Sequence, residues 1–270
     1  MTKPVECDVS LLTLSGVTKC FGGLSALNEI SLHIRHGEIY GLIGPNGAGK
    51  TTLFNILTGL YQADNGHFTF NGVNYNRHCK PHVLAQAGIA RTFQNIRLFA
   101  NMTALENVMV GRHPRTSGGI WSALTRNAAA RAEEHAIVQH ARALLSYVGI
   151  NRPHQTLAKN LSYGEQRRLE IARALATDPK LLALDEPAAG MNATETESLK
   201  ELLLSIRARG ITVLLIEHDV KFILGLCDRV AVLDYGKKIA EDTPEKIRCD
   251  PAVITAYLGT ESNIPAQAEI

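Results

Sequence analysis

The first part of the chain is built from short apolar runs that alternate with polar positions. The segments SLHI at 31–34 and IYGLI at 39–43 have the pattern of β-strands, and GHFTFNG at 66–72 is a further short strand. Between them, TTLFNILTGL at 51–60 has helical periodicity and predicts a helix that ends at Gly59. This part therefore predicts several strands and one helix.

The pattern then turns helical from about residue 95 to 177, where strand signals are lost. An Ala-, Arg- and Glu-rich segment fills 121–149, and the Gly- and Pro-broken stretch RHPRTSGGIW at 112–121 predicts a loop that carries the single tryptophan. The segment therefore predicts a helical insertion with one irregular loop.

Strands return after the helical segment. LLALD at 181–185 and ITVLLI at 211–216 predict buried strands, 195–209 a helix, and VAVLD with KKIAE a closing pair of strands. We expect one mixed-sheet core, formed by about 1–94 and 176–260. A helical subdomain at about 95–175 is inserted into it, and a polar C-terminal tail follows at 261–270.

Composition narrows the class of protein. The 270 residues are 45% hydrophobic and 20% charged, which is ordinary for a folded soluble protein, and the net charge of +2 gives no support to a nucleic-acid partner. Five cysteines without a Cys-x-x-Cys pair favour reduced thiols in a cytoplasm. Glu6 and Asp8 argue against a signal peptide, and no apolar run approaches the roughly 18 residues of a membrane span.

One stretch matches a complete phosphate-binding loop, G-x-x-x-x-G-K-[ST]. Glycines let backbone N–H groups curl around phosphate oxygens, Lys50 places a charge on the β- and γ-phosphates, and Thr51 offers its hydroxyl to Mg²⁺. A Gly-rich turn is the bland alternative, but the loop follows an apolar strand and opens a helix, which favours nucleotide binding. The predicted nucleotide-binding residues of this loop are Gly44, Pro45, Asn46, Gly47, Ala48, Gly49, Lys50, Thr51 and Thr52.

Carboxylates follow two of the predicted strands. LLALDEP ends in Asp185 and Glu186, of which Asp185 would hold Mg²⁺ and Glu186 would take a proton from an attacking water. ITVLLIEHD delivers His218 to the same edge of the sheet. Taken singly, His218 has the pattern of a surface histidine, Gln94 is unremarkable, and Phe21 has the pattern of a core residue.

A second helix start, LSYGEQRRLEIARAL at 161–175, has a capping box made by Ser162 and Glu165. Gly164 stands in its first turn, where a capped helix gains nothing from glycine. A merely capped amphipathic helix explains Ser162 and Glu165 but not Gly164.

Taken in order, Phe21, the phosphate loop, Gln94, LSYGEQ, LLALDEP and His218 resemble the nucleotide-binding subunit of ABC transporters over nearly the whole chain. The resemblance implies an α/β fold: a P-loop NTPase core of ABC ATPase type, with an antiparallel β subdomain and an inserted helical subdomain. It implies that Phe21 stacks on adenine and that ATP is hydrolysed with Mg²⁺ as cofactor. The implied catalytic residues are Glu186, His218 and Gln94, the implied metal ligands Thr51, Gln94 and Asp185, and the implied signature acting on the partner's ATP Ser162, Tyr163, Gly164, Glu165 and Gln166.

Further segments narrow the resemblance to the ATPases of branched-chain amino acid importers. These are RTFQNIRLFANMTALENVMVGRH, the signature tyrosine, DEPAAGMN and PAVITAYLG, and the insertion at 112–130 resembles the longer ATPase of the pair. Tyr163 replaces the usual glycine, and Asn192 stands where many members have aspartate.

The resemblance also implies partners and a place in the cell. The partners are a second, related ATPase, two transmembrane permease subunits and, indirectly, a periplasmic binding protein, with no nucleic acid. The place is the cytoplasmic face of the inner membrane, as a peripheral subunit. Leucine, isoleucine and valine are the implied cargo, and other amino acids, amides or urea-like solutes stay open.

Other functions have weaker support. A lipopolysaccharide-export ATPase, which pairs with itself, has a similar core, but Tyr163 and the insertion at 112–130 argue against it. A non-transport ABC protein of translation or DNA repair would carry two ATPase domains or a coiled coil, and a kinase-like P-loop enzyme would not need the signature. We expect the permease-coupling surface within 94–110, with Arg97, Leu98 and Phe99 as candidates; ordinary packing is the alternative reading of these three.

Overall fold

A computed structural model gives the fold of residues 10–75, 79–113, 128–153 and 155–258. The chain divides into two compact units, one formed by residues 1–81 with 206–270 and the other by residues 82–205.

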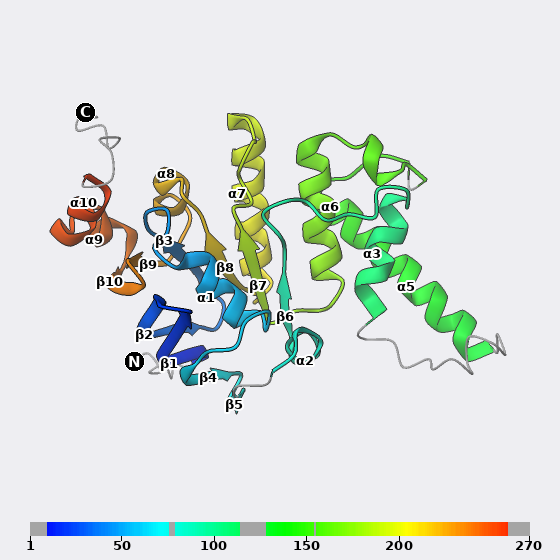
Figure 1. Cartoon of the computed structure of the whole chain (residues 1–270). Coiled ribbons are helices and arrows are strands. Elements are labelled where there is room, and N and C mark those ends of the chain that lie inside the picture. Colours follow the sequence, from blue (N-terminus) through cyan, green and yellow to red (C-terminus); the bar gives the residue numbers. More distant parts are fainter. Residues whose placement is uncertain (1–9, 76–78, 114–127, 154, 259–270) are drawn as a thin grey trace, which may run out of the picture. The chain divides into compact units, whose positions relative to one another are not determined.

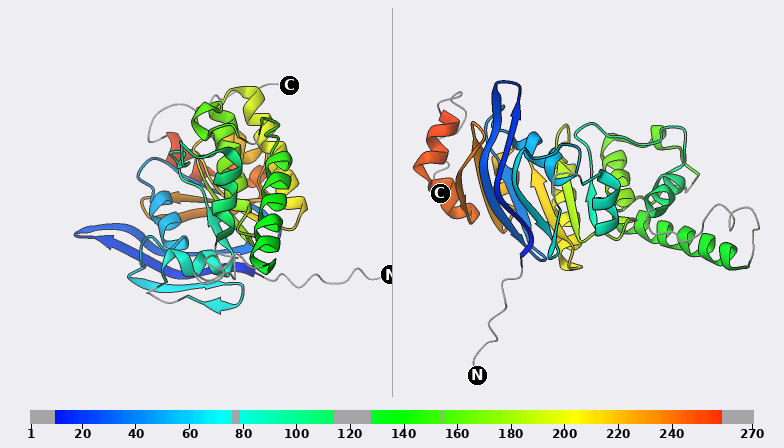
Figure 2. Two further views of the ribbon diagram at one scale, coloured as in Figure 1. Left: turned by 90° about the vertical axis from the view of Figure 1, so that its right-hand side faces the viewer. Right: turned by 60° about the horizontal axis from the view of Figure 1, so that its bottom comes forward.

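The first unit contains an antiparallel sheet in the order β2-β1-β4-β5. Its strands are β1 (Ser10–Phe21), β2 (Leu24–Arg35), β4 (Asn65–Phe70) and β5 (Val73–Asn74). β1 and β2 form a ribbon of 12 residues each, and its tip reaches beyond the other strands of the sheet (Figure 2). The sequence predicted shorter strands here, because the register between β1 and β2 shifts at several points and the apolar alternation is broken with it.

A second set of strands carries the parallel part of this unit. In the order β10-β9-β3-β8 they are β10 (Lys237–Asp242), β9 (Arg229–Asp234), β3 (Ile39–Ile43) and β8 (Thr212–Ile216). β3 pairs parallel with β8 and with β9, whereas β9 and β10, the predicted closing pair, are antiparallel. All residues of β3 and β8 are buried, so both strands read as continuous apolar runs.

Short helices follow these strands. α1 (Lys50–Leu57) follows β3 as the sequence predicted, and α8 (Val220–Leu224) follows β8. The last two described elements are the helices α9 (Pro244–Cys249) and α10 (Pro251–Leu258), which the sequence analysis did not predict. α9 packs on β9 and β10, and α10 packs on β10 (Figure 1).

The second unit combines two parallel strands with helices. β6 (Ile89–Arg91) pairs parallel with β7 (Leu181–Asp185), and α3 packs against both α5 and α6 (Figure 1). The helices in or reaching into this unit are α2 (Pro81–Ala87), α3 (Ala104–Arg112), α5 (Ala128–Tyr147), η2 (Ala158–Asn160), α6 (Tyr163–Leu175) and α7 (Ala193–Ala208).

The helical prediction for about 95–177 is confirmed in the described residues of that stretch. The predicted loop at 112–121 lies outside the described residues from position 114 onward, as does the tail at 261–270. Over the described part of the chain, no helix is both long enough and apolar enough to cross a membrane.

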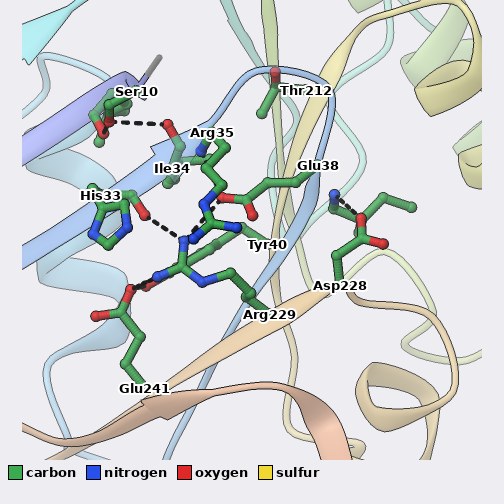
Figure 3. A network of polar contacts seen from close by, with 12 residues as sticks. Ser10, His33, Ile34, Arg35, Glu38, Tyr40, Thr212, Asp228, Arg229 and Glu241 are labelled. Atoms are coloured by element: carbon green, nitrogen blue, oxygen red, sulfur yellow. Dashed lines mark hydrogen bonds and ion pairs between the residues drawn. The ribbon is translucent and has the colours of Figure 1, made fainter. Parts of the chain in front are cut away.

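A network of largely buried polar side chains joins strands of the first unit (Figure 3). Arg229 of β9 donates to Glu241 at 2.6 Å, to Glu38 at 3.3 Å and to the carbonyl oxygen of His33 at 3.1 Å. The Tyr40 hydroxyl of β3 donates to the same oxygen of Glu241 at 2.7 Å. The network therefore ties β10 to the amino end of β3, the strand that leads into the phosphate loop.

The charges of the network are tuned by burial and by their partners. Burial raises the pKa of Tyr40 well above its usual value, and burial also raises the pKa of Glu38. For Glu241 burial acts in the same direction, but the hydrogen bonds from Lys238 and Tyr40 outweigh it and hold the pKa of Glu241 below its ordinary value. Glu241 is therefore ionised at neutral pH.

Candidate functional site

The glycines of the phosphate loop have different surroundings. Gly44 has a φ of 150°, and a side chain there would collide with the carbonyl oxygen of Leu233 in β9. Gly47 has a φ of 82°, and a Cβ at this position would have nothing within 4 Å. Gly44 is thus required for packing, whereas Gly47 presents open backbone, which is what close approach of phosphate oxygens requires.

The first turn of α1 offers a positive helix end next to this loop. Gly49 is the N-cap residue without a side-chain cap, and the first turn contains no acidic residue that would neutralise the dipole. Lys50 donates from Nζ to the carbonyl oxygens of Gly44 at 2.6 Å and Pro45 at 2.9 Å, which holds its ammonium group in the loop. Thr51 is exposed on the same turn, with its hydroxyl suited to a hard cation.

The C-terminal helix α10 contacts this loop. Tyr257 lies against the backbone of Gly44, and burial raises the pKa of Tyr257 to about 12 although that contact acts in the opposite direction. The phosphate loop is therefore supported by a segment far from it in the sequence.

Phe21 stands at the end of β1 and is 44% exposed, so the interpretation as a core residue does not hold. The ring of Tyr61 meets it edge-on at a centroid distance of 5.4 Å, and Lys19 lies 5.3 Å from its centre. Phe21 and Tyr61 form an exposed aromatic surface on which a purine ring can stack, and Lys19, which is paired with Asp64, adds a cation beside it. Tyr61 was not predicted from the sequence, because forty positions separate it from Phe21 and no local pattern joins them.

The end of β8 brings three polar residues to its carboxyl edge. Glu217 is almost fully buried, whereas the side chain of His218 is 60% exposed with Nδ1 4.0 Å from the Glu217 carboxylate. Asp219 is the N-cap of α8 and accepts from the N–H of Phe222 at 3.1 Å. His218 and Asp219 are thus exposed beside the buried Glu217, and His218 lies between that carboxylate and the N-cap of α8.

In the second unit, the end of β7 carries the predicted carboxylate pair. Asp185 is the last residue of the strand and is buried, and the next residue, Glu186, has a φ of 45°. This left-handed conformation costs a residue other than glycine about 1–2 kcal/mol, and such strain concentrates at functional sites. Gln94 Nε2 donates to Glu186 Oε2 at 2.9 Å, which brings two of the predicted catalytic side chains together.

The signature helix α6 starts as predicted. Ser162 Oγ accepts from the N–H of Glu165 at 3.3 Å, and the Glu165 carboxylate accepts from the N–H of Ser162 at 2.9 Å. The hydrogen bond from Arg152 is the main cause that lowers the pKa of Glu165. The capping carboxylate is therefore ionised at the N-terminus of this helix.

The structure gives a packing reason for the glycine at position 164, which the sequence did not. A Cβ on Gly164 would lie 2.7 Å from a carboxylate oxygen of Glu195 in the first turn of α7, so the missing side chain makes room for Glu195. The ring of Tyr163 lies beside Gly190 in the loop after Glu186, where a Cβ would be 3.4 Å from it. Gly164 and Tyr163 thus pack on the segment that follows Asp185 and Glu186 in the same chain.

The predicted site residues fall on both units. The first unit carries Phe21, the phosphate loop and His218, and the second carries Gln94, Asp185, Glu186 and the signature. Within the first unit the loop residues lie together, and within the second Gln94 contacts Glu186. The sequence analysis also missed Arg167 and Glu170 of α6, whose i, i+3 spacing was the available signal.

Comparison with known proteins agrees with this arrangement. The family model for ABC transporters matches residues 27–189, and the model for branched-chain amino acid ATP-binding cassette transporters matches residues 237–262. The chain is 45% identical over 253 residues to the high-affinity branched-chain amino acid transport ATP-binding protein LivG of Salmonella typhimurium, covering 92% of this chain and 98% of that protein.

More distant relatives share the same length of chain. The lipopolysaccharide export system ATP-binding protein LptB of Haemophilus influenzae is 35% identical over 254 residues, covering 94% of this chain and 99% of that protein. A solved ATP-binding cassette of an ABC transporter in its ADP conformation superposes with a TM-score of 0.81 at 33% identity, covering 93% of this chain and 99% of that chain. The expected ABC ATPase fold is confirmed, and the chain belongs to the ABC transporter family, among the ATP-binding cassettes of the branched-chain amino acid type.

Proposed function

We propose that this chain is the ATP-hydrolysing subunit of an importer that takes up branched-chain amino acids, leucine, isoleucine and valine, across the inner membrane. The observation that carries the ATPase is the hydrogen bond between Gln94 and Glu186 at the end of β7, in a backbone strained at Glu186. The cargo rests on the similarity to LivG over nearly the whole chain. The cytoplasmic face of the membrane is the proposed location.

Each side chain has a proposed task in the reaction of ATP with water to give ADP and phosphate. Glu186 accepts the proton of the attacking water, Gln94 orients Glu186, and His218 contacts the γ-phosphate. Lys50 and the loop amides hold the β- and γ-phosphates. The hydroxyl, carboxylate and amide oxygens of Thr51, Asp185 and Gln94 suit Mg²⁺, which would supply charge neutralisation on the phosphates when bound.

The signature is proposed to act on the ATP of a second, related ATPase subunit. The N-terminus of α6 has Gly164 in its first turn, and the positive end of a helix attracts a phosphate group. Two such subunits would pair head-to-tail with two ATP molecules between them. Two transmembrane permease subunits and, indirectly, a periplasmic binding protein complete the proposed importer, of which this chain is the longer ATPase.

The loop from Arg97 to Phe99 is the proposed contact to the permease. Phe99 is 50% exposed, yet its backbone is fixed: its N–H donates to Asn107 Oδ1 at 3.0 Å and its carbonyl accepts from Asn107 Nδ2 at 3.1 Å. A rigidly held, exposed aromatic side chain is typical of an interface anchor. This loop belongs to the proposed helical subdomain at about 95–175, between the two parts of the ATP-binding core at about 1–94 and 176–260.

The variant Glu186→Gln tests the chemistry, because it keeps the side-chain volume and removes the base. We expect ATP binding to persist, turnover to fall about 10²–10⁴-fold, and closed dimer to accumulate. Near-normal hydrolysis by this variant would remove Glu186 from its role.

Native mass spectrometry of the complex extracted from its own membranes tests the assembly. One copy of this chain with a different ATPase and two membrane subunits supports the importer. The second candidate is a self-paired export ATPase, which the 35% identity to LptB favours. Two copies of this chain in one complex would move that function to the front.

A further inference from the structure

An ion pair is buried completely inside the second unit. Arg167 and Glu170 lie one turn apart on α6, their side chains are 0% and 1% exposed, and Arg167 NH1 donates to Glu170 Oε2 at 2.8 Å. Burying two charges is costly unless further hydrogen bonds compensate them. Their remaining contacts therefore indicate what the pair is for.

Both side chains bind the backbone of the loop that carries Gln94. Arg167 donates from NH1 to the carbonyl oxygen of Phe93 at 2.7 Å and from NH2 to that of Gln94 at 2.8 Å. Glu170 Oε1 accepts from the N–H of Phe93 at 3.3 Å and, more weakly, from that of Arg97 at 3.5 Å. The backbone is thus held on both sides of Gln94 by one helix.

A side chain of the same loop, Phe93, makes further contacts. The guanidinium groups of Arg91 and Arg97 each lie 4.4 Å from the ring centre of Phe93. The Phe93 ring therefore contacts two cations, while Arg167 and Glu170 hold its backbone. The side chain of Gln94 is left to reach Glu186.

We propose that Arg167 and Glu170 are positioning residues, which set the place of Gln94 and so join the signature helix to the catalytic carboxylate of the same chain. The proposal rests on the proposed ATPase function and deepens it. One helix then serves both ATP sites: its N-terminus acts on the partner's nucleotide, and its second turn holds the glutamine that acts on its own. A shift of α6 caused by the partner's nucleotide is therefore transmitted to Gln94, which acts on the nucleotide bound by its own chain.

The arginine is required for its shape as much as for its charge. Its planar fork spans two successive carbonyl oxygens, which the single ammonium group of lysine does not do. Arg167→Lys therefore keeps the ion pair with Glu170 while it weakens the hold on the loop. The double variant Arg167→Met, Glu170→Leu removes the hold without stranding a charge, because buried pairs are often replaced by apolar residues without loss of stability.

The experiment compares both variants with Glu186→Gln and with Lys200→Met in the purified transporter complex. Lys200 pairs with Glu197 at the same i, i+3 spacing on α7, but with an exposed partner, so it controls for loss of a helical ion pair. ATP hydrolysis gives kcat and KM, nucleotide binding gives Kd, and hydrogen exchange reports the amides of Phe93 and Arg97.

We expect the double variant to lower kcat about 10-fold to 100-fold, since a misplacement of 1 Å can cost about 100-fold, with Kd for ATP within about twofold. The Phe93 and Arg97 amides should exchange faster, Arg167→Lys should fall between the double variant and the wild type, and Lys200→Met should match the wild type. Unchanged kcat together with unchanged exchange in the double variant overturns the proposal. If the double variant does not fold, Arg167→Lys is the test, and a kcat of Arg167→Lys equal to that of the wild type overturns the proposal.

Failure of the proposed function gives a different result. A wild-type complex that does not hydrolyse ATP, or a Glu186→Gln variant that still does, removes the ATPase assignment. The exchange of the Phe93 and Arg97 amides still tests the hold of Arg167 and Glu170 on the loop in that case.

Discussion

The network around Arg229 allows a graded test of how buried polar contacts fasten β10 to β3 (Figure 3). We consider three single changes, Tyr40→Phe, Arg229→Met and Lys246→Met, and measure the free energy of unfolding of each. Tyr40→Phe removes one hydroxyl, Arg229→Met removes the shared cation, and Lys246→Met removes an exposed partner of Asp242 as a control.

The contacts in the structure predict which variant loses the most free energy of unfolding. The Tyr40 hydroxyl donates to an ionised carboxylate, a bond of about 1.5–3 kcal/mol, and Glu241 keeps Arg229 and Lys238, so we expect a loss of about 1.5 kcal/mol. Arg229→Met takes the cation from Glu38 and Glu241, whose side chains are 8% and 10% exposed. Glu241 keeps Lys238, but Glu38 loses its ion pair with Arg229, and a buried charge left without its ionic partner costs about 3–5 kcal/mol, so this variant should be the least stable.

Urea unfolding with linear extrapolation measures the three free energies. Lys246→Met should equal the wild type, because its pair with Asp242 is solvated. If Arg229→Met lowered the free energy of unfolding by less than about 1 kcal/mol, its ion pairs would be worth no more than ordinary surface salt bridges. That result would refute the reasoning.

Three further outcomes follow from the same structure. Gly47→Ala should fold but bind ATP more weakly by isothermal titration, whereas Gly44→Ala should lose stability because its Cβ meets the carbonyl of Leu233. The pKa of Glu241 lies below its ordinary 4.5 in the folded state, so its stabilisation is present above that pH and is lost as the pH falls through the folded value. Glu241→Gln should therefore be less stable than the wild type at pH 7, with a difference that shrinks below about pH 4.5 in urea titrations. Asn107→Leu should release the backbone of Phe99 in the proposed permease contact and lower transport in vesicles more than ATP hydrolysis, and equal losses of both would contradict this.

Much of the fold could be predicted because its strands and helices carry local patterns. β3, β7 and β8 are continuous apolar runs since both faces are covered, and α6 has a capping box within four residues. The β1–β2 ribbon was predicted too short and α9 and α10 were missed. Register shifts break the apolar alternation of the ribbon, and the six residues of α9 are too few for a helical period to show.

By itself the sequence determined the chemistry that contiguous residues make. The phosphate loop, the carboxylates after LLALD and the cap of α6 all depend on neighbours along the chain, whose geometry follows from backbone rules. The tertiary structure alone decided which distant side chains support them. Arg167 meets the backbone of Phe93 across 74 positions, and Glu195 fills the space that Gly164 leaves. No local pattern encodes such contacts, because packing of separate helices and strands creates them only after the chain has folded.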